Sequence, residues 1–294
     1  MATALITGGT SGIGAAFARQ LAAAGYDLVL VARDPARLKS VSAELHAASG
    51  IKVETISADL AMRGDVAKVV ARIDDAARPI DILVNNAGMA VRAPLTATDT
   101  SLHDSAFEVM CRAILVLGGA AGRSMTARGT VTIINISSLQ GFLATGSYGA
   151  IKAWVTAYSQ GLAVELRGTG VTVTAVLPGW VRTEWHERAG VRRNSLPGWL
   201  WSEPDDVVRI ALRDASRGRV ICIPTVRYRV LGWFARHLPM TTIRWISAGI
   251  SSGRLTEAAV VPQTVPDDVS RGSVLPSAGA DGSEHPVVEA DETR

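Results

Sequence analysis

Seven short apolar stretches alternate with longer amphipathic stretches over about the first 225 residues of the chain. Each apolar stretch has the length and the β-branched residues typical of a buried strand, and a helical pattern separates it from the next. Apolar strands separated by helices favour a parallel sheet that is covered on both faces, with right-handed crossovers. We therefore predict an α/β fold with a doubly wound, seven-stranded parallel sheet. The predicted strands are ATALIT, DLVLVA, KVETIS, DILVN, TVTIINIS, VTVTAVL and RVICI, all expected to be buried, and the predicted helices lie near residues 12–24, 35–48, 64–77, 100–127, 146–168 and 204–216.

Residues 251–294 differ in composition from the rest of the chain. They contain eight acidic residues but only three arginines. They also contain four prolines and no aromatic residue. Such a composition cannot bury enough apolar surface to offset the entropy of ordering the segment. We expect one domain over residues 1–250 and a disordered tail over residues 251–294.

The remaining composition argues against several classes of protein. Cys111 and Cys222 lie inside apolar runs, so we expect buried thiols and neither a disulfide nor a metal site. No apolar run approaches the roughly 18 residues of a membrane span, and the opening MATALIT is too short and uncharged for a signal peptide. The net charge of +3 comes without a nucleic-acid-binding motif. We expect a cytoplasmic protein with no nucleic-acid partner.

A glycine-rich turn, TGGTSGIG, directly follows the first predicted strand and opens the first predicted helix. Glycine permits a tight turn, a close approach of the backbone to a pyrophosphate and close packing of helix on strand. The amide end of a helix also attracts phosphate groups. In this context the turn predicts a dinucleotide site on a Rossmann fold, with a glycine-rich loop of no chemical role as the alternative. The residues assigned to the cofactor here are Gly8, Thr10, Ser11, Gly12, Ile13 and Gly14.

The second predicted strand ends at Ala32 and Arg33. An acidic residue at this point would bind the adenosine ribose of NAD and repel the 2′-phosphate of NADP. A guanidinium group suits that phosphate instead. We predict that NADP(H) is preferred over NAD(H), with Arg33 as the discriminating residue and Arg37 or Ser11 assisting. A solvated arginine at a strand end is the alternative.

Tyr148 and Lys152 lie four residues apart in YGAIK, so they share one face of a predicted helix. An ammonium group beside a phenol lowers the pKa of the phenol from about 10, toward the range useful for general acid catalysis. Ser138 lies ten residues upstream in NISS. Hydride transfer to a ketone develops negative charge on the oxygen, and these hydroxyls could donate to it. Alone, a Tyr-x-x-x-Lys pair also arises in any amphipathic helix.

Taken as an ordered set, the motifs resemble those of the short-chain dehydrogenase/reductase family. The set comprises TGGTSGIG, the Asp59–Leu60 pair, NNAG at 85–88, NISS with YGAIK, and PGWVRT at 178–183. The resemblance covers about residues 4–185 and implies a homodimer or homotetramer.

The resemblance also implies roles for individual residues. Ser138 would hold the substrate carbonyl oxygen, Tyr148 would deliver the proton and Lys152 would grip the nicotinamide ribose. The remaining implied cofactor contacts are Asp59 and Leu60 on the adenine side, Asn86, Ala87 and Gly88 beside the fourth strand, and Pro178, Gly179, Val181 and Thr183 at the nicotinamide end.

Two features depart from the family pattern. Met110 stands where the family commonly has an asparagine that anchors a proton-carrying water, and the stretch from Ser138 to Tyr148 is about three residues shorter than usual. A methionine cannot anchor such a water. Either water reaches Lys152 by another route or turnover is slow, so a catalytically weak or inactive NADP(H)-binding sensor or scaffold is the alternative function.

Residues 180–203 combine four tryptophans with several arginines, and in this family the stretch forms a variable lid over the substrate. The tryptophans indicate a wide pocket for a steroid-like ring system or a long acyl chain, or else a lid packed on its own aromatic residues. PGWVRTEWHERAG also resembles a subgroup that acts on keto groups of lipids. We expect an NADPH-dependent oxidoreductase that reduces a ketone, and reversibly oxidises a secondary alcohol, on a bulky apolar substrate such as a 3-oxoacyl lipid.

Residues 225–250 are basic and aromatic, and no acidic residue occurs from Ala215 to Thr256. A helical stretch of this kind could lie on an anionic membrane surface. It could equally cap the pocket or pack against another subunit.

Overall fold

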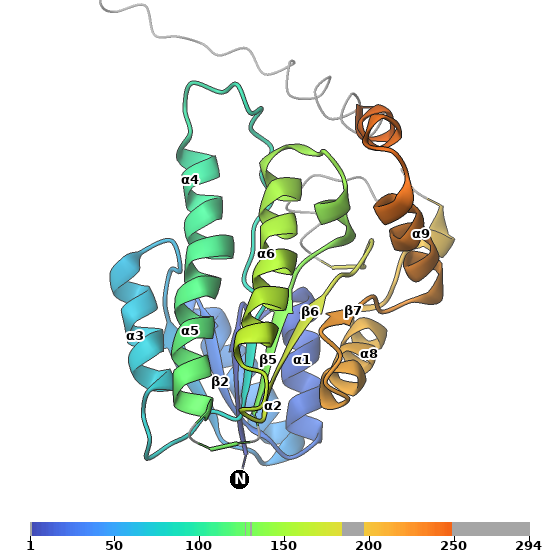
Figure 1. Cartoon of the computed structure of the whole chain (residues 1–294). Helices are drawn as coiled ribbons and strands as arrows, with labels where there is room; N and C mark the ends of the chain where they lie inside the picture. The colour runs from blue at the N-terminus through green and yellow to red at the C-terminus, as the bar shows by residue number, and fades with distance from the viewer. Residues whose placement is uncertain (1, 127, 130, 184–196, 249–294) are drawn as a thin grey trace, which may run out of the picture.

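The computed structural model contains the predicted sheet (Figure 1). All neighbouring strands are parallel, in the order β3-β2-β1-β4-β5-β6-β7. The chain begins in the middle of the sheet, adds β2 and β3 on one side, and then crosses over to add the other four strands beyond β1. The doubly wound α/β prediction is confirmed. The strands are β1 (Thr3–Thr7), β2 (Asp27–Ala32), β3 (Val53–Ser57), β4 (Ile82–Asn85), β5 (Val131–Ile136), β6 (Val171–Val176) and β7 (Ile221–Cys222).

The structure describes residues 2–126, 128–129, 131–183 and 197–248. The predicted tail and residues 184–196 of the predicted lid lie outside these ranges.

Helices cover both faces of the sheet and form two separate cores with it. Alternate residues of a strand point to opposite faces. In β1, Ala4 and Ile6 join the core beneath α1, α2 and α8, whereas Leu5 joins the core beneath α3, α5 and α6. The two cores explain why the strands read as continuous apolar runs. The helices are α1 (Gly12–Ala23), α2 (Pro35–Ser49), α3 (Arg63–Ile73), α4 (Ser101–Phe107), the π-helix η1 (Glu108–Arg112), α5 (Ala113–Thr126), the 3-10 helix η2 (Leu139–Phe142), α6 (Gly146–Glu165), the 3-10 helix η4 (Gly198–Leu200), α8 (Pro204–Ser216) and α9 (Val226–His237).

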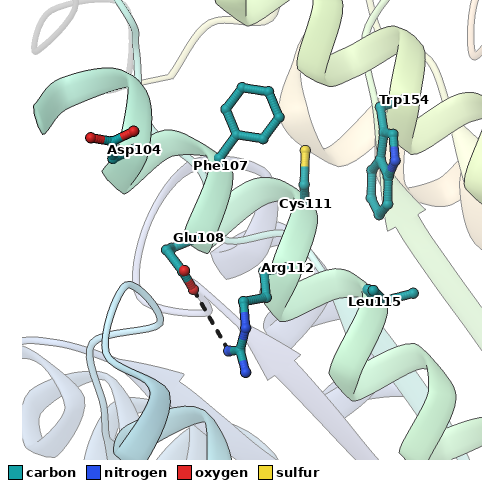
Figure 2. A pocket seen from close by; sticks show the side chains of 7 residues that line it. All are labelled: Asp104, Phe107, Glu108, Cys111, Arg112, Leu115 and Trp154. Carbon is teal, nitrogen blue, oxygen red and sulfur yellow. Dashed lines mark ion pairs between the residues drawn. The ribbon is translucent and has the colours of Figure 1, made fainter. Parts of the chain in front are cut away.

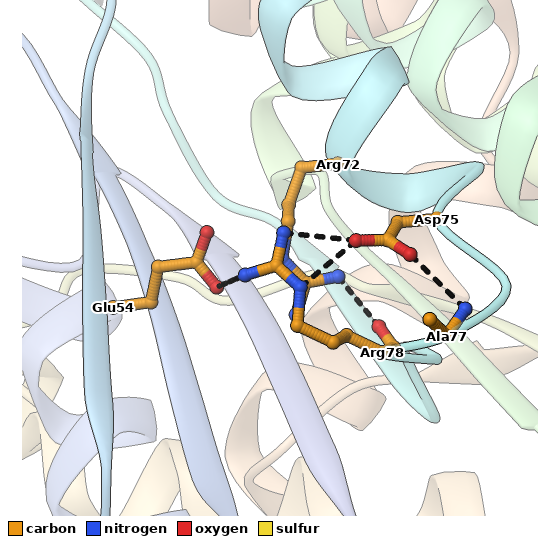
Figure 3. A network of polar contacts seen from close by, with 5 residues as sticks. All are labelled: Glu54, Arg72, Asp75, Ala77 and Arg78. Atoms are coloured by element: carbon orange, nitrogen blue, oxygen red, sulfur yellow. Dashed lines mark hydrogen bonds and ion pairs between the residues drawn. The ribbon is translucent and has the colours of Figure 1, made fainter.

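The edge strand β3 corrects the expectation that all seven strands are buried, since each of its residues is partly or fully exposed. Its Glu54 carboxylate accepts a hydrogen bond from Arg72 Nε at 2.8 Å and lies 3.2 Å from Arg78 Nη1 (Figure 3). Arg72 is buried and also donates to the Arg78 carbonyl at 2.6 Å. Because a buried guanidinium needs partners, this network fixes α3 against the sheet edge.

The other edge strand, β7, is shorter than the predicted RVICI. It pairs with β6 at Ile221 and Cys222. Pro224 follows shortly after and has no N–H to extend the ladder.

α4, η1 and α5 together form one long helical stretch, Ser101–Thr126. By length and composition alone it could cross a membrane, with a mean hydropathy of 1.4 over its most apolar window. About 56% of that window is buried inside the molecule, where Leu117 and Met125 belong to the core with α3 and α6. The apolar composition therefore serves the packing of a core helix.

A chain of buried polar side chains joins β4, β5 and α6. Asn85 Nδ2 donates to Asn135 Oδ1 at 2.9 Å, and Asn135 Nδ2 donates to Ser159 Oγ at 3.0 Å. Ser159 in turn donates to the Val155 carbonyl at 2.7 Å. Since buried polar groups are costly without partners, these bonds fix α6 against β5.

Candidate active site

A cavity of about 510 Å³ opens at the carboxyl ends of the strands, around the point where the chain crosses from one side of β1 to the other. In doubly wound folds this is where ligands bind. Nearly all the predicted site residues meet there, although the elements that carry them are far apart in the chain. Those that line the cavity are Gly8, Thr10, Ser11, Gly12, Ile13, Arg33, Asp59, Leu60, Asn86, Ala87, Gly88, Ser138, Tyr148, Lys152, Pro178, Val181 and Thr183.

The glycine turn leads into α1 as predicted, with two residues in the left-handed region that favours glycine. Gly8 has φ 66° and Gly12 has φ 54°. Gly14 does not line the cavity but packs below the turn, where a Cβ atom would lie 2.2 Å from the Gly8 carbonyl oxygen. Gly14 therefore permits the close packing of helix on strand that the sequence predicts.

The loop after β4 holds the glycine turn in place. Asn86 Nδ2 donates to the carbonyl oxygens of Thr7 at 3.0 Å and of Gly8 at 3.1 Å. In return, Thr7 Oγ1 accepts hydrogen bonds from the backbone N–H groups of Asn86 at 2.9 Å and Ala87 at 3.0 Å. The asparagine of NNAG thus positions the turn as well as lining the cavity.

The amide end of α1 fits a phosphate group. Among the described residues, the Ser11 side chain makes no capping hydrogen bond at this helix, and its first turn carries no acidic residue. The first N–H groups of a helix lack partners within the helix and carry a partial positive charge. With the glycine cradle beside them, they match the pyrophosphate of a dinucleotide.

Two arginines, Arg33 and Arg37, line the cavity beyond the end of β2. The Arg33 backbone is held by Ser57, whose hydroxyl donates to the Arg33 carbonyl at 3.2 Å, and Arg37 Nε donates to the Thr10 carbonyl at 3.1 Å. The carboxylate of Asp34 also lies here but caps α2, accepting from Ala36 N at 2.9 Å and Arg37 N at 3.1 Å. Sequence reasoning missed Asp34, for which the Asp-Pro start of the helix was the available signal.

Just after the neighbouring strand β3, which pairs with β2 at this end, Asp59 forms a local turn. Its carboxylate accepts a hydrogen bond from Ala61 N at 3.0 Å, and its own N–H donates to Asp65 at 2.8 Å. Asp59 and Leu60 both line the cavity.

The Lys152 amine is buried beside Tyr148, with only 4% of the lysine exposed. Its Nζ donates to the Ile136 carbonyl at 2.8 Å and lies 5.6 Å from the centroid of the Tyr148 ring. Burial lowers the pKa of Lys152 to about 8, and the nearby Cys111 acts weakly in the opposite direction. Burial likewise raises the pKa of Cys111 to about 11. The predicted adjacency of Tyr148 and Lys152 is present.

The two serines of NISS have different surroundings. Ser137 Oγ donates to the Lys152 carbonyl at 2.7 Å and contacts Thr156 Oγ1 at the same distance. Ser138 caps η2 by accepting from Gln140 N at 3.2 Å. Sequence reasoning assigned only Ser138, and it missed that Ser137 anchors the helix carrying Lys152.

Gly179 corrects a prediction, because it packs behind the cavity instead of lining it. A Cβ atom there would lie 2.1 Å from Tyr228 Cζ. The Tyr228 hydroxyl accepts from Trp180 N at 3.0 Å and donates to the Leu200 carbonyl. Tyr228 thus fixes the loop after β6 from outside, a contact that no local sequence signal predicts.

Met110 lies in η1 and is fully buried, yet it forms part of the cavity wall against Gly88. Met110 is the residue that stands where the family commonly has an asparagine. A π-helix inside a longer helix often marks a functional site, because it shifts the register of the side chains.

A second hollow of similar volume lies between η1, α5 and α6 and is more open to solvent (Figure 2). It contains no predicted site residue among the residues that the structure describes. Phe107, Leu115 and Trp154 give it an apolar wall. Glu108 and Arg112 also line it and form an ion pair, with 3.6 Å between Oε2 and Nη1.

The short-chain dehydrogenase family model matches residues 2–193 of the chain. This chain belongs to the short-chain dehydrogenase family. It is an oxidoreductase of that type, similar in sequence to gluconate 5-dehydrogenase of Gluconobacter oxydans, with 33% identity over 74% of this chain and 88% of the relative.

Two solved structures are similar to this chain over about nine-tenths of its length. A short-chain dehydrogenase from Sphingobium yanoikuyae in complex with NADPH is 36% identical, with a TM-score of 0.72, over 91% of this chain and 99% of that one. The bulky-bulky ketone specific alcohol dehydrogenase from Comamonas testosteroni is 30% identical, with a TM-score of 0.69, over 90% of this chain and 96% of that one.

We predict that Gly14→Ala lowers the free energy of unfolding by about 1–3 kcal/mol and weakens NADPH binding, because the added methyl group meets the Gly8 carbonyl. Gly161→Ala is the matched control, since a Cβ atom in that exposed position of α6 meets nothing within 4 Å. It should raise stability by about 0.5–1 kcal/mol. Urea unfolding and NADPH fluorescence titration measure both effects, and equal behaviour of the two variants would contradict this account of the turn.

Proposed function

We propose that the protein is an NADPH-dependent ketoreductase. The observation that carries the proposal is the buried Lys152 ammonium beside the Tyr148 ring, with Ser138 on the same cavity wall. The three residues form a group of donors at one end of a cavity whose other end suits phosphates. Relatives that reduce or oxidise hydroxyl and keto compounds support the same reaction class.

Each side chain has a role that follows from its chemistry. Ser138 donates a hydrogen bond to the substrate carbonyl oxygen, where negative charge develops during reduction. Tyr148 donates the proton to that oxygen as general acid. Lys152 holds a positive charge beside the phenol, favours its deprotonated form and binds the nicotinamide ribose. Bound NADPH supplies the hydride.

The preference for NADPH over NADH rests on Arg33. Arg33 follows the end of β2 and lines the cavity, as does Arg37, which is anchored to the Thr10 carbonyl. The neighbouring carboxylate of Asp34 accepts two helix N–H groups, so it is already satisfied as a cap. The NADPH complex of the Sphingobium yanoikuyae relative supports the same choice.

The substrate is proposed to be bulky and apolar, with a 3-oxoacyl lipid or a steroid-like ketone as the preferred class. Met89, Val109 and Met110 line the cavity on the side of Tyr148, and Trp180 packs edge-on to Trp201 with 5.9 Å between ring centroids. The Comamonas testosteroni enzyme is specific for bulky-bulky ketones, whereas the Gluconobacter oxydans relative is a dehydrogenase of the polar compound gluconate. Gluconate is therefore the polar comparison in any substrate panel.

A second candidate is an NADP(H)-binding sensor or scaffold with little catalysis. Its one support is Met110, which cannot anchor the water that the family asparagine holds. Binding of NADPH without oxidation by any ketone of a broad panel would favour this candidate.

We further propose that two copies of the chain associate through the face around the second hollow. Phe107 and Leu115 are about half exposed there. Exposed apolar side chains that line a hollow are typical of a subunit contact.

Tyr148→Phe should lower kcat for ketone reduction by at least about 100-fold, because the phenylalanine has no proton to donate. NADPH should still bind within a few-fold of the wild-type Kd, since the ring and Lys152 remain. Tyr158→Phe is the control from the same helix, where the hydroxyl makes one long bond of 3.4 Å to the Leu115 carbonyl. Full activity of Tyr148→Phe would refute the assignment.

Arg33→Ala should lower the ratio of kcat/KM for NADPH to kcat/KM for NADH by about 10- to 100-fold, the worth of one charge-assisted phosphate contact. The kcat/KM for NADH should change little. Arg19→Ala serves as the control, because Arg19 pairs with Asp205 at 2.9 Å on the outer side of α1. An unchanged cofactor ratio in Arg33→Ala would show that another group selects the cofactor.

A further inference from the structure

Exposed apolar side chains gather on α9 and on the helical residues 240–248 that follow it. Seven of the thirteen large hydrophobic side chains exposed in the described part of the chain lie in this segment. Monomeric soluble proteins rarely expose such a cluster without a function. Its members are Val226, Val230, Leu231, Trp233, Phe234, Met240 and Trp245.

The outward face of α9 is apolar, although the helix also has a buried face. Tyr228 and Gly232 face the molecule. The opposite stripe, at helical spacing, carries Val226, Val230 and Trp233. A surface helix normally places polar residues on that side. The apolar residues there therefore need a partner outside the described fold.

The aromatic side chains of this stripe support one another. Trp233 packs edge-on to Phe234, with 5.1 Å between ring centroids, and stacks on His237 at 4.5 Å. Trp245, which is 79% exposed, follows on the helical residues 240–248. The structure thus presents a preformed aromatic surface.

The charged residues within this segment are all arginines. Arg229, Arg236 and Arg244 are exposed, and no acidic residue occurs between Ala215 and Ala248. Arg236 lies over the Phe142 ring at 5.9 Å, and Arg229 donates to the Ile223 carbonyl at 3.0 Å. Both arginines are therefore held against the fold while they remain exposed.

We propose that residues 226–245 dock on the anionic surface of a lipid bilayer. Tryptophan and phenylalanine favour the boundary between headgroups and acyl chains, and arginines attract anionic headgroups. A symmetric contact with a second copy of this surface is disfavoured, because it would bring the same row of arginines together. The proposal goes beyond the ketoreductase function and does not depend on it.

In Figure 1, α9 lies next to the carboxyl end of β6, from which the Pro178–Gly179 loop continues. Gly232 packs against Leu139, the residue after Ser138, and Tyr228 packs against Gly179. Docking would therefore place the segments next to Ser138 and Gly179 close to the bilayer, where a lipid ketone would be found.

The test is sedimentation of the full chain with vesicles of phosphatidylcholine, with and without phosphatidylglycerol. We expect pelleting with the anionic vesicles, and at least a tenfold weaker partition for Trp233→Ser combined with Phe234→Ser. Replacing Arg229, Arg236 and Arg244 together by glutamine should have a similar effect and should remove the salt dependence. The control is Leu95→Ser combined with Met62→Ser, which changes side chains that are 72% and 61% exposed elsewhere.

Equal pelleting of the patch variants and the wild-type chain would overturn the proposal, as would equal pelleting with neutral and anionic vesicles. Self-association without vesicles that the patch variants abolish would assign the surface to a subunit contact instead. Reduction of a soluble ketone should be unchanged in all variants, so a failure of docking is distinguishable from a failure of the proposed reaction.

Discussion

The buried amine of Lys152 is the group on which the rest of the site depends. A lysine with 4% exposure needs a partner for its N–H groups, and the Ile136 carbonyl at the end of β5 supplies one at 2.8 Å. That bond fixes the first half of α6 over the end of the sheet, and the Asn135–Ser159 bond fixes the second half. Tyr148, on the same helix, is thereby held at the cavity beside the charge of the buried Lys152 amine.

The cofactor end of the cavity depends on a different constraint, the close approach of backbone segments. Gly14 lets α1 sit against the Gly8 carbonyl, and the Asn86 side chain bridges two carbonyl groups of the same turn. The result is an amide end of a helix that faces the cavity with its N–H groups in place. A rigid anion site at one end and a proton donor at the other end define where a nicotinamide dinucleotide and a ketone would meet.

Much of this could be predicted from the sequence, because the signals are local. Apolar runs indicate strands buried on both faces. Gly8 and Gly12 indicate a turn with a left-handed backbone, and Gly14 indicates close packing of helix on strand. Contacts between distant segments left no such signal. Tyr228 packs against Gly179, and Arg72 pairs with Glu54, only because the fold brings these distant segments together.

The most direct test is a pH titration of the protein labelled with ¹³C-lysine, observed at Cε by NMR. The chain has four lysines, and Lys39, Lys52 and Lys68 are exposed. We expect one lysine resonance to titrate near pH 8, the value to which burial lowers the pKa of Lys152. The low resonance should be missing from Lys152→Met. If no lysine resonance titrates near pH 8, the amine is solvated and the account of the site is contradicted.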